Sequence, residues 1–415
     1  MLHRTRLPAP VMAVLATGTL DSLGASVVGL AVIWLLTGLT HSAADLGLFF
    51  MVIELPYLLL LVPAGIWADR TNRRRLALVV LALRILATLA MAWLAHLHHL
   101  AWYLIAPAVV AQESLSAVLQ PSVSAWIFGM TPQEDFAALN GWRQAASHLA
   151  SLLGPSLGGI LIAVAGVPGT IVAGALAGVA NWLGIGLNRR PERPREQSPG
   201  ASEAGRGVLA GWRFLRQHPG MLGMILFFSA TNGLNNVEAV LVPLLARLVL
   251  HLPAWQFGLL FTAFGVGGIA GSWVGVRLDA HGVRRLPWAF AAMAVFGLAI
   301  VAMGFARSAL WLGLAYLVLG LSFALTEVLT STLWQRMVPD DMRGRVMSTM
   351  GTLARTANPI GFLLAGWLGV VVGIRGGLWV GGGAIIGLTL LISVSRQVRT
   401  LERSLAPAMG ERAGS

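Results

Sequence analysis

The sequence predicts an all-α polytopic membrane protein, with twelve transmembrane helices in two six-helix, pseudo-symmetric bundles. Three observations predict this fold. Of the 415 residues, 56% are hydrophobic and only 11% are charged, whereas soluble domains carry about 25% charged residues. Apolar segments of about 20 residues, the length that crosses a bilayer as a helix, recur along the whole chain. Short motifs of the first half also return in the second half, about 210 residues further along the chain.

Twelve segments are long and apolar enough to span a bilayer. In the first half they cover residues 11–37, 44–67, 75–96, 101–129, 142–165 and 168–187. In the second half they cover residues 220–247, 255–278, 286–306, 309–335, 346–373 and 376–395. Arg4 and Arg6 precede the first segment as in a signal peptide, but Asp21 interrupts the apolar run, which is too long to be a cleaved segment. We therefore predict that the first segment is retained.

The basic residues predict the orientation of the spans. All 29 are arginine, and the cytoplasmic loops of membrane proteins collect such residues. With the N-terminus inside, 24 arginines fall on the cytoplasmic side, Arg84 and Arg355 lie within spans, and three fall outside. Both termini are therefore expected in the cytoplasm. The net charge of +12 follows from this topology and does not indicate nucleic-acid binding.

One polar segment divides the chain. It is rich in Pro, Glu, Ser and Arg, a composition that cannot bury a core and is typical of a linker. Leu209, Trp212 and Leu215 recur at helical spacing near its end, which predicts a short amphipathic helix on the inner membrane surface. The predicted domains are a six-helix bundle at 1–188, a cytoplasmic linker at 189–218, a second bundle at 219–396 and a cytoplasmic tail at 397–415.

Two motifs reveal an internal repeat. A shift of 210 residues superposes GIWADRTNRRR at 65–75 on GVRLDAHGVRR at 275–285. A shift of 207 residues superposes MTPQED, which begins at Met130, on MVPDDM, which begins at Met337. Two six-span repeats in parallel orientation are a known plan of membrane transporters, in which substrate binds near the midplane between the halves.

On these motifs the sequence resembles the major facilitator superfamily over essentially the whole chain. The loop after the second span is similar to the superfamily signature Gly-x-Leu-Ala-Asp-Arg-x-Gly-Arg-Arg, with Trp67 in place of leucine and Asn72 in place of the second glycine. The second copy keeps the aspartate as Asp279 but has Ala280 in place of the first arginine. The resemblance implies the superfamily fold and transport by alternating access.

The signature loop predicts a cytoplasmic latch. An aspartate at a helix end forms charge-assisted contacts with nearby arginines, and a latch that forms in one state and breaks in the other sets the balance between them. Topology alone explains the arginines equally well, but an acid contributes nothing to positive-inside orientation. The predicted latch residues are Gly65, Asp69, Arg70, Arg73, Arg74, Asp279, Arg284, Arg285, Arg343 and Arg345.

The fifth span carries a second signature, GWRQAASHLASLLGPSLGG. It resembles the span-5 motif of the superfamily's exporters, with Ala150 in place of one glycine. Small residues at this spacing let helices approach closely, and proline bends the helix. Physically the motif therefore predicts packing, and only the resemblance links it to export. Its residues are Gly141, Gly154, Pro155, Gly158 and Gly159. LWQRMVPDDMRGRVMS at 333–348, together with the second span, further resembles the branch of macrolide-efflux and enterobactin-export proteins.

Five acids fall inside predicted spans, where ionisable side chains are costly and mark functional sites by default. They are Asp21, Glu54, Glu113, Glu238 and Glu327. The resemblance implies that spans 1, 4, 7 and 10 line a central cavity, and these spans hold four of the five acids. A carboxylate there can carry a proton inward as substrate leaves. Alternatively, an acid pairs with Arg84 or Arg355, or faces water at a helix end.

Other polar side chains on the same spans complete the predicted pocket. They are Gln112, Gln120, Asn232, Asn235, Asn236 and Thr326. Together with Phe227, Phe228 and Phe323 they predict a mostly apolar pocket with scattered hydrogen-bonding groups, although each is as well explained by helix packing. Acids without arginine on these spans favour a neutral or cationic amphipathic compound and disfavour a polyanion.

The sequence thus predicts a proton-coupled exporter of a small amphipathic compound, such as a drug, a macrolide-like or a siderophore-like metabolite. The alternatives are a proton-coupled importer of a small solute, or a non-transporting membrane sensor or enzyme. We find no nucleophile–base pair or metal cluster for an enzyme, and no sizeable soluble domain for a sensor. We expect a monomer in the bacterial inner membrane, with a small-molecule substrate, protons and the lipid bilayer as partners. We expect no cofactor, metal or nucleic acid.

Overall fold

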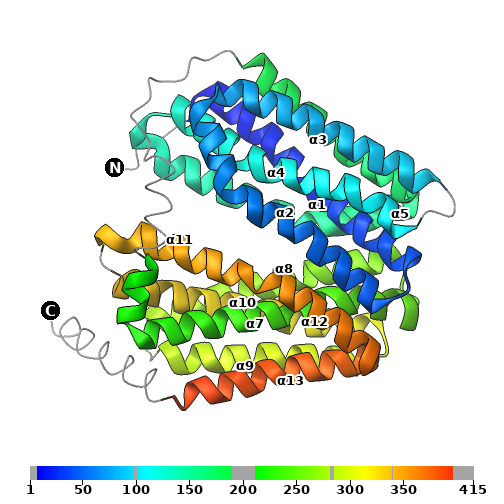
Figure 1. The fold of residues 1–415 in the computed structure, drawn as a ribbon, viewed down its shortest axis with the longest axis vertical. Coiled ribbons are helices and arrows are strands. Elements are labelled where there is room, and N and C mark those ends of the chain that lie inside the picture. The colour runs from blue at the N-terminus through cyan, green and yellow to red at the C-terminus, as the bar shows by residue number, and fades with distance from the viewer. Residues whose placement is uncertain (1–6, 98–100, 189–210, 281–284, 339, 396–415) are drawn as a thin grey trace. The chain divides into compact units, whose positions relative to one another are not determined.

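The computed structural model describes residues 7–97, 101–188, 211–280, 285–338 and 340–395, in which nearly all residues are helical and none is in a strand. Within these ranges, some helical positions have side chains that are not described, and they are named below where they matter. Figure 1 shows the path of the chain.

The first half contains four separate helices and one long one. They are α1 (Ala9–Leu39), α2 (Ala43–Arg70), α3 (Arg73–His96), α4 (Trp102–Met130) and α5 (Phe136–Leu187). The short 3-10 helix η1 (Gln133–Asp135) precedes α5. Gly166 interrupts α5 with a φ of +69°, a left-handed conformation that glycine adopts without steric cost. The bend lies in the predicted gap between the fifth and sixth spans, so α5 holds both spans.

The second half begins with a short helix at residues 211–217. It is followed by α7 (Pro219–Leu244), the short π-helix η2 (Leu245–Val249), α8 (Ala254–Ala280), α9 (Arg285–Gly304), α10 (Ala309–Met337), α11 (Asp340–Thr356), α12 (Asn358–Val371) and α13 (Gly373–Ser393). The predicted eleventh span is broken between α11 and α12. Pro359, in the first turn of α12, has no N–H to bond the carbonyl of Arg355, so α11 ends at Thr356.

Ten helical stretches in the described part of the chain are long and apolar enough to cross a membrane. One of them, η1 with α5, contains two spans. The eleventh span is divided into α11 and α12, with 17 and 14 residues. The predicted twelve-span, all-α architecture is therefore confirmed.

The chain divides into two compact units. The first contains Met1–Thr40, Val52–Ala201 and Leu252–Thr262, and the second contains His41–Met51, Ser202–His251 and Ala263–Ser415. Each half of the sequence therefore contributes most of one unit and a short segment of the other.

In the first unit α1 packs along α5, and α3 packs against α4 and α5 (Figure 1). Its core joins these helices through buried side chains such as Leu81, Trp126, Leu139 and Ile185. In the second unit α9 packs between α10 and α13, and α7 packs against α11, α12 and α13. Its core includes Met224, Phe227, Leu286, Phe290 and Trp334.

The repeat extends to backbone conformation. His41 and His251, which a shift of 210 residues superposes, both have a φ of +51°. Histidine is one of the few residues other than glycine that is enriched in this left-handed region. Each histidine lies in the turn between the first and second helix of its half, so the two halves share a local turn geometry that the shared motifs did not reveal.

The contact between α1 and α5 depends on Gly154, because a Cβ at this position would meet the Cβ of Ser26. We expect Gly154→Ala to lower the midpoint of thermal unfolding in detergent, since overpacking a tight contact costs about 1–3 kcal/mol. Gly141→Ala on the same helix is the control, because Gly141 has no other heavy atom within 4 Å of the added carbon. Equal midpoints for the two variants would contradict this packing.

Candidate functional site

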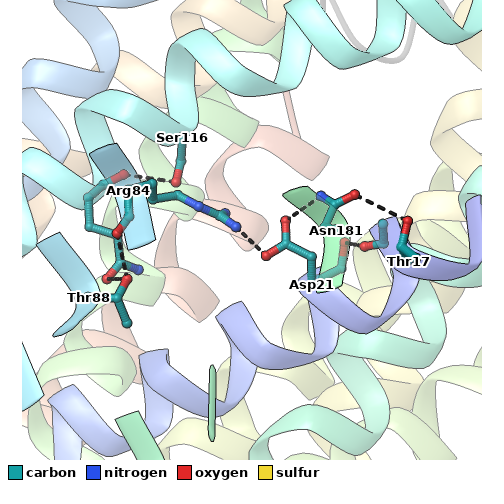
Figure 2. Close-up of polar contacts among 9 residues, drawn as sticks. Thr17, Asp21, Arg84, Thr88, Ser116 and Asn181 are labelled. Atoms are coloured by element: carbon teal, nitrogen blue, oxygen red, sulfur yellow. Dashed lines mark hydrogen bonds and ion pairs between the residues drawn. The ribbon is translucent and has the colours of Figure 1, made fainter. Parts of the chain in front are cut away.

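A buried charge network lies inside the first unit. Asp21 of α1 forms an ion pair with Arg84 of α3, and both residues are less than 10% exposed. The side-chain amide of Asn181, in the second half of α5, donates a hydrogen bond of 2.9 Å to the other carboxylate oxygen of Asp21. Thr17 donates to the Asn181 Oδ1 at 3.4 Å. Figure 2 shows these side chains converging from three helices.

The network extends to α4. The hydroxyl of Thr88 donates to the backbone carbonyl of Arg84 at 2.9 Å and lies 3.4 Å from Gln112 Oε1. Ser116 donates to the backbone carbonyl of Gln112 at 2.9 Å (Figure 2). Asp21 is thus held in place by a cation and an amide, the pairing with Arg84 that the sequence left open as an alternative. A role for Asp21 in proton transfer stays a prediction.

The first unit also contains a cavity of about 600 Å³ beside this network. It is formed by α1, α4 and the two halves of α5, and its lining is largely polar. The polar residues that line it are Thr19, Asp21, Ser22, Gln120, Ser124, Asn140, Arg143, Gln144, Ser147 and Asn181. Of the predicted site residues, this first pocket contains Asp21 and Gln120.

Arg143 is the functional candidate that sequence reasoning missed, because it was counted among the arginines of the cytoplasmic side. Its Nη1 donates a hydrogen bond of 2.8 Å to Ser124 Oγ, and its guanidinium lies 5.5 Å from the ring centroid of Phe128. The signal was present in the sequence. Asn140, Arg143, Gln144 and Ser147 recur at the spacing of one helix face, and this polar stripe faces the pocket.

The second unit contains a cavity of about 370 Å³ formed by α7, α9, α10 and α11. From the predicted site it contains Asn232, Asn235 and Glu327, together with Thr326, Phe228 and Phe323. Its remaining wall is mostly apolar and includes Met293, Phe296, Trp334, Met347 and Met350. The methionines come from α9 and α11, which the sequence did not assign to a pocket.

Two asparagines on α7 that the sequence assigned to the pocket also form hydrogen bonds at the break between α11 and α12. The Asn232 amide donates to the carbonyl of Ala354 at 3.0 Å, and the Asn236 amide donates to the carbonyl of Asn358 at 3.1 Å. Ser229 donates to the carbonyl of Leu353 at 2.7 Å. The carbonyls of Leu353 and Ala354 lie in the last turn of α11, where backbone donors are missing, so Ser229 and Asn232 replace them. Asn358 is the first residue of α12, and the bond from Asn236 ties α7 to that helix. Asn236 does not line the second pocket.

The other acids line neither pocket. Glu238 of α7 accepts a hydrogen bond from the hydroxyl of Tyr316 on α10, which is 3% exposed. Glu113 of α4 interacts electrostatically with Arg84 and with Glu54 of α2. Glu54 and Glu113 therefore belong to the same charged region as the Asp21–Arg84 pair, although neither lines the cavity beside it.

Most of the predicted latch lies outside the described residues or side chains. This holds for Arg284, for the surroundings of Gly65 and for the side chains of Asp69, Arg70, Asp279, Arg343 and Arg345. Arg73 donates to the carbonyl of Ala125 at 3.4 Å, and Arg285 is buried. Arg74 donates to the carbonyls of Ile185 and Gly186 at 3.2 and 2.6 Å, which ties α3 to the end of α5. The latch stays a prediction.

The predicted span-5 motif is a packing surface within the first unit. Gly154 and Gly158 lie against Ser26 and Val27 of α1, and Gly159 lies against Ala254. Next to Pro155, Ser156 donates to the carbonyl of Gly258 at 3.0 Å. Gly141 has open space around it and takes no part in this packing.

Comparison with known proteins agrees with this architecture. The family model of the Major Facilitator Superfamily matches residues 14–361. The multidrug efflux pump Tap of Mycolicibacterium fortuitum is 25% identical over 380 residues, which cover 88% of this chain and 90% of Tap. The enterobactin exporter EntS of Citrobacter koseri is 27% identical over 351 residues, which cover 80% of this chain and 79% of EntS.

Solved structures show the same fold at low sequence identity. The nucleoside transporter NupG superposes with a TM-score of 0.69 at 12% identity, over 93% of this chain and 98% of NupG. A bacterial homologue of the iron transporter ferroportin superposes with a TM-score of 0.68 at 14% identity, over 93% of this chain and 99% of that chain.

The buried ion pair predicts a non-additive pair of substitutions. Arg84→Met leaves the Asp21 carboxylate without its cation, and breaking a buried pair in this way costs about 3–5 kcal/mol. We expect a large fall in the thermal unfolding midpoint in detergent, and recovery of most of it in the double variant Asp21→Asn/Arg84→Met. Arg75→Met, at the exposed start of the same helix, is the control. Additive effects of the two substitutions would rule out the coupling.

Proposed function

Because the chain belongs to the Major Facilitator Superfamily, we propose that it exports a small amphipathic compound in exchange for protons. The observation that carries this proposal is the chemistry of the second pocket. Its wall is built from aromatic side chains and methionines, and among the lining residues that the structure describes Glu327 is the one acid. Such a pocket suits a compound with an apolar body and a cationic group.

The acceptors of the second pocket support a cationic group on the substrate. Among the described residues, Asn235 Oδ1 is a buried acceptor with no hydrogen-bond partner. An unsatisfied buried acceptor costs about 1–3 kcal/mol, so a bound ammonium N–H would be stabilised there as well as by Glu327. The unbranched methionine side chains adapt to apolar surfaces of different shape, which suits more than one compound.

The direction of transport is inferred from two lines of support. The curated relatives Tap and EntS carry the names of an efflux pump and an exporter, and the alignments cover most of both chains. The small residues of span 5 resemble the motif of the superfamily's exporters and pack tightly against α1. Import would reverse the direction, and the transport assay below distinguishes the two.

Proton coupling is assigned to the charged region of the first unit. Glu113 and Glu54 are two carboxylates that interact with each other, and Arg84 acts on Glu113 while it pairs with Asp21. A proton on Glu113 removes one negative charge from this group. It therefore changes how the attraction of the Arg84 guanidinium is divided between Glu113 and Asp21. Export would then follow from protonation on the outside and proton release on the inside. Glu113 is the proposed proton carrier.

The remaining assignments rest on the sequence. We infer a multi-pass protein with both termini in the cytoplasm of a bacterium, acting as a monomer in its inner membrane. The residues around Asp69 are proposed to form a cytoplasmic latch that is made in one transport state and broken in the other. Asp279 is proposed to play the equivalent part in the second half.

Efflux of fluorescent cations tests the proposed function. In bacteria that lack their own pumps, we expect the protein to lower retention of a lipophilic cationic dye, and a protonophore to abolish this effect. Glu327→Gln should reduce export several-fold at equal membrane levels, because it removes the pocket's acid. Glu134→Gln is the control, since this carboxylate is exposed on η1. Protonophore-sensitive accumulation of the dye would indicate an importer instead.

The latch has its own test. We expect Asp69→Asn to lower dye export strongly while the purified variant still binds the dye with unchanged affinity, because the latch changes the balance of states and not the pocket. Asp45→Asn is the control, since Asp45 lies in the first turn of the same helix. Normal export by Asp69→Asn would leave topology as the only role of the loop.

A further inference from the structure

The two pockets are the same site of the internal repeat, formed once in each unit. On α1 and α7 a shift of 210 residues superposes the lining residues of one pocket on those of the other. The matched pairs are Leu15 with Ile225, Gly18 with Phe228, Asp21 with Thr231 and Ser22 with Asn232. On α4 and α10 a shift of 207 residues does the same. The matched pairs are Leu119 with Thr326, Gln120 with Glu327, Val123 with Thr330, Ser124 with Ser331 and Ile127 with Trp334.

The third wall has diverged most. On α5 and α11 the matched pairs are Asn140 with Met347, Arg143 with Met350, Gln144 with Gly351 and Ser147 with Ala354. Every polar residue of this face in the first unit is thus replaced by an apolar or small one in the second. One pocket of the repeat has a hydrogen-bonding wall with a guanidinium, and the other has an apolar wall.

The charges of the two pockets are also opposite. In the first pocket the Asp21 carboxylate is compensated by Arg84 and accepts a hydrogen bond from Asn181. The partners described for Arg143 are the Ser124 hydroxyl and the Phe128 ring, which are both neutral. The first pocket therefore carries the uncompensated positive charge of Arg143. The second pocket carries the negative charge of Glu327.

We propose that Arg143 forms an anion subsite, which binds one carboxylate or ionised phenol of the substrate. This inference rests on the proposed function and adds to it one class of transported compound, which carries a single oxyanion recognised by the first pocket alone. Arginine has five N–H donors in a planar fork that matches a carboxylate, and Ser124 takes one of them. Gln144 and Asn140 add neutral amide donors on the same face. A single guanidinium suits one oxyanion and not a polyanion.

A pair of dyes that differ in one group tests the subsite. Tetramethylrhodamine has a free carboxylate, and its methyl ester has the same ring system without that charge. Binding of each dye to the purified protein is measured by fluorescence anisotropy at neutral pH. We expect Arg143→Met, which installs the side-chain type found at Met350, to weaken binding of the carboxylate dye about tenfold, the effect of losing one charge-assisted hydrogen bond. Binding of the ester should change less than twofold.

Two further variants separate the subsite from general damage. Arg143→Lys keeps the positive charge and should retain most of the affinity for the carboxylate dye, with an unchanged elution volume in size-exclusion chromatography. Glu134→Gln, at an exposed carboxylate on η1, should bind both dyes as tightly as the wild type does.

The outcomes distinguish the subsite from the function on which it rests. If Arg143→Met weakens both dyes equally or neither, the anion subsite is wrong, while a wild type that binds and exports the ester leaves the exporter in place. If the wild type binds neither dye, the amphipathic substrate class is wrong, and the subsite with it. If Arg143→Met loses affinity for the carboxylate dye but not for the ester, the result supports both the anion subsite and the proposed function.

Discussion

The hydrocarbon core of a bilayer contains no water to bond a backbone N–H or carbonyl, and every span of this protein is shaped by that constraint. Continuous helices satisfy the constraint over most of the chain, and the interruptions are where side chains must act. At the break that Pro359 imposes between α11 and α12, the Ser229 hydroxyl and the Asn232 amide bond the carbonyls of Leu353 and Ala354 in the last turn of α11. A break in a helix therefore requires polar residues on its neighbour, and polarity within a span is not by itself evidence of a binding site.

The same constraint governs charge. Asp21 is tolerated inside the first unit because Arg84 and Asn181 surround its carboxylate, and Glu238 is held by the hydroxyl of Tyr316. Each of these partners lies on a different helix from the acid. The charged groups thus fix how helices are placed relative to one another within a unit. Burying each acid is tolerated only while the helices hold its partner in position.

The sequence was sufficient for the architecture but not for the partners of individual side chains. Span lengths, the arginine bias and the repeat predicted the twelve helices, and the gap predicted between spans five and six coincides with the bend at Gly166. Hydrophobic runs and periodicity are read within one segment of the sequence, so they predict helices but not contacts between helices. The contact between Asp21 and Arg84 joins positions far apart in the chain and depends on how each helix is rotated. For the same reason Arg143 was assigned to topology although it faces a pocket.

The position of the pocket walls also bears on how the protein can evolve. Asn140, Gln144 and Ser147 are exposed on α5, away from the core that holds the first unit together. Substitutions at such positions have little effect on stability, so selection can change what the wall binds without endangering the fold. Duplication of the bundle supplied two copies of this permissive face. At the matched positions on α11 stand methionines and small residues, so the same face of the repeat has different chemistry in its two copies while both bundles keep their fold.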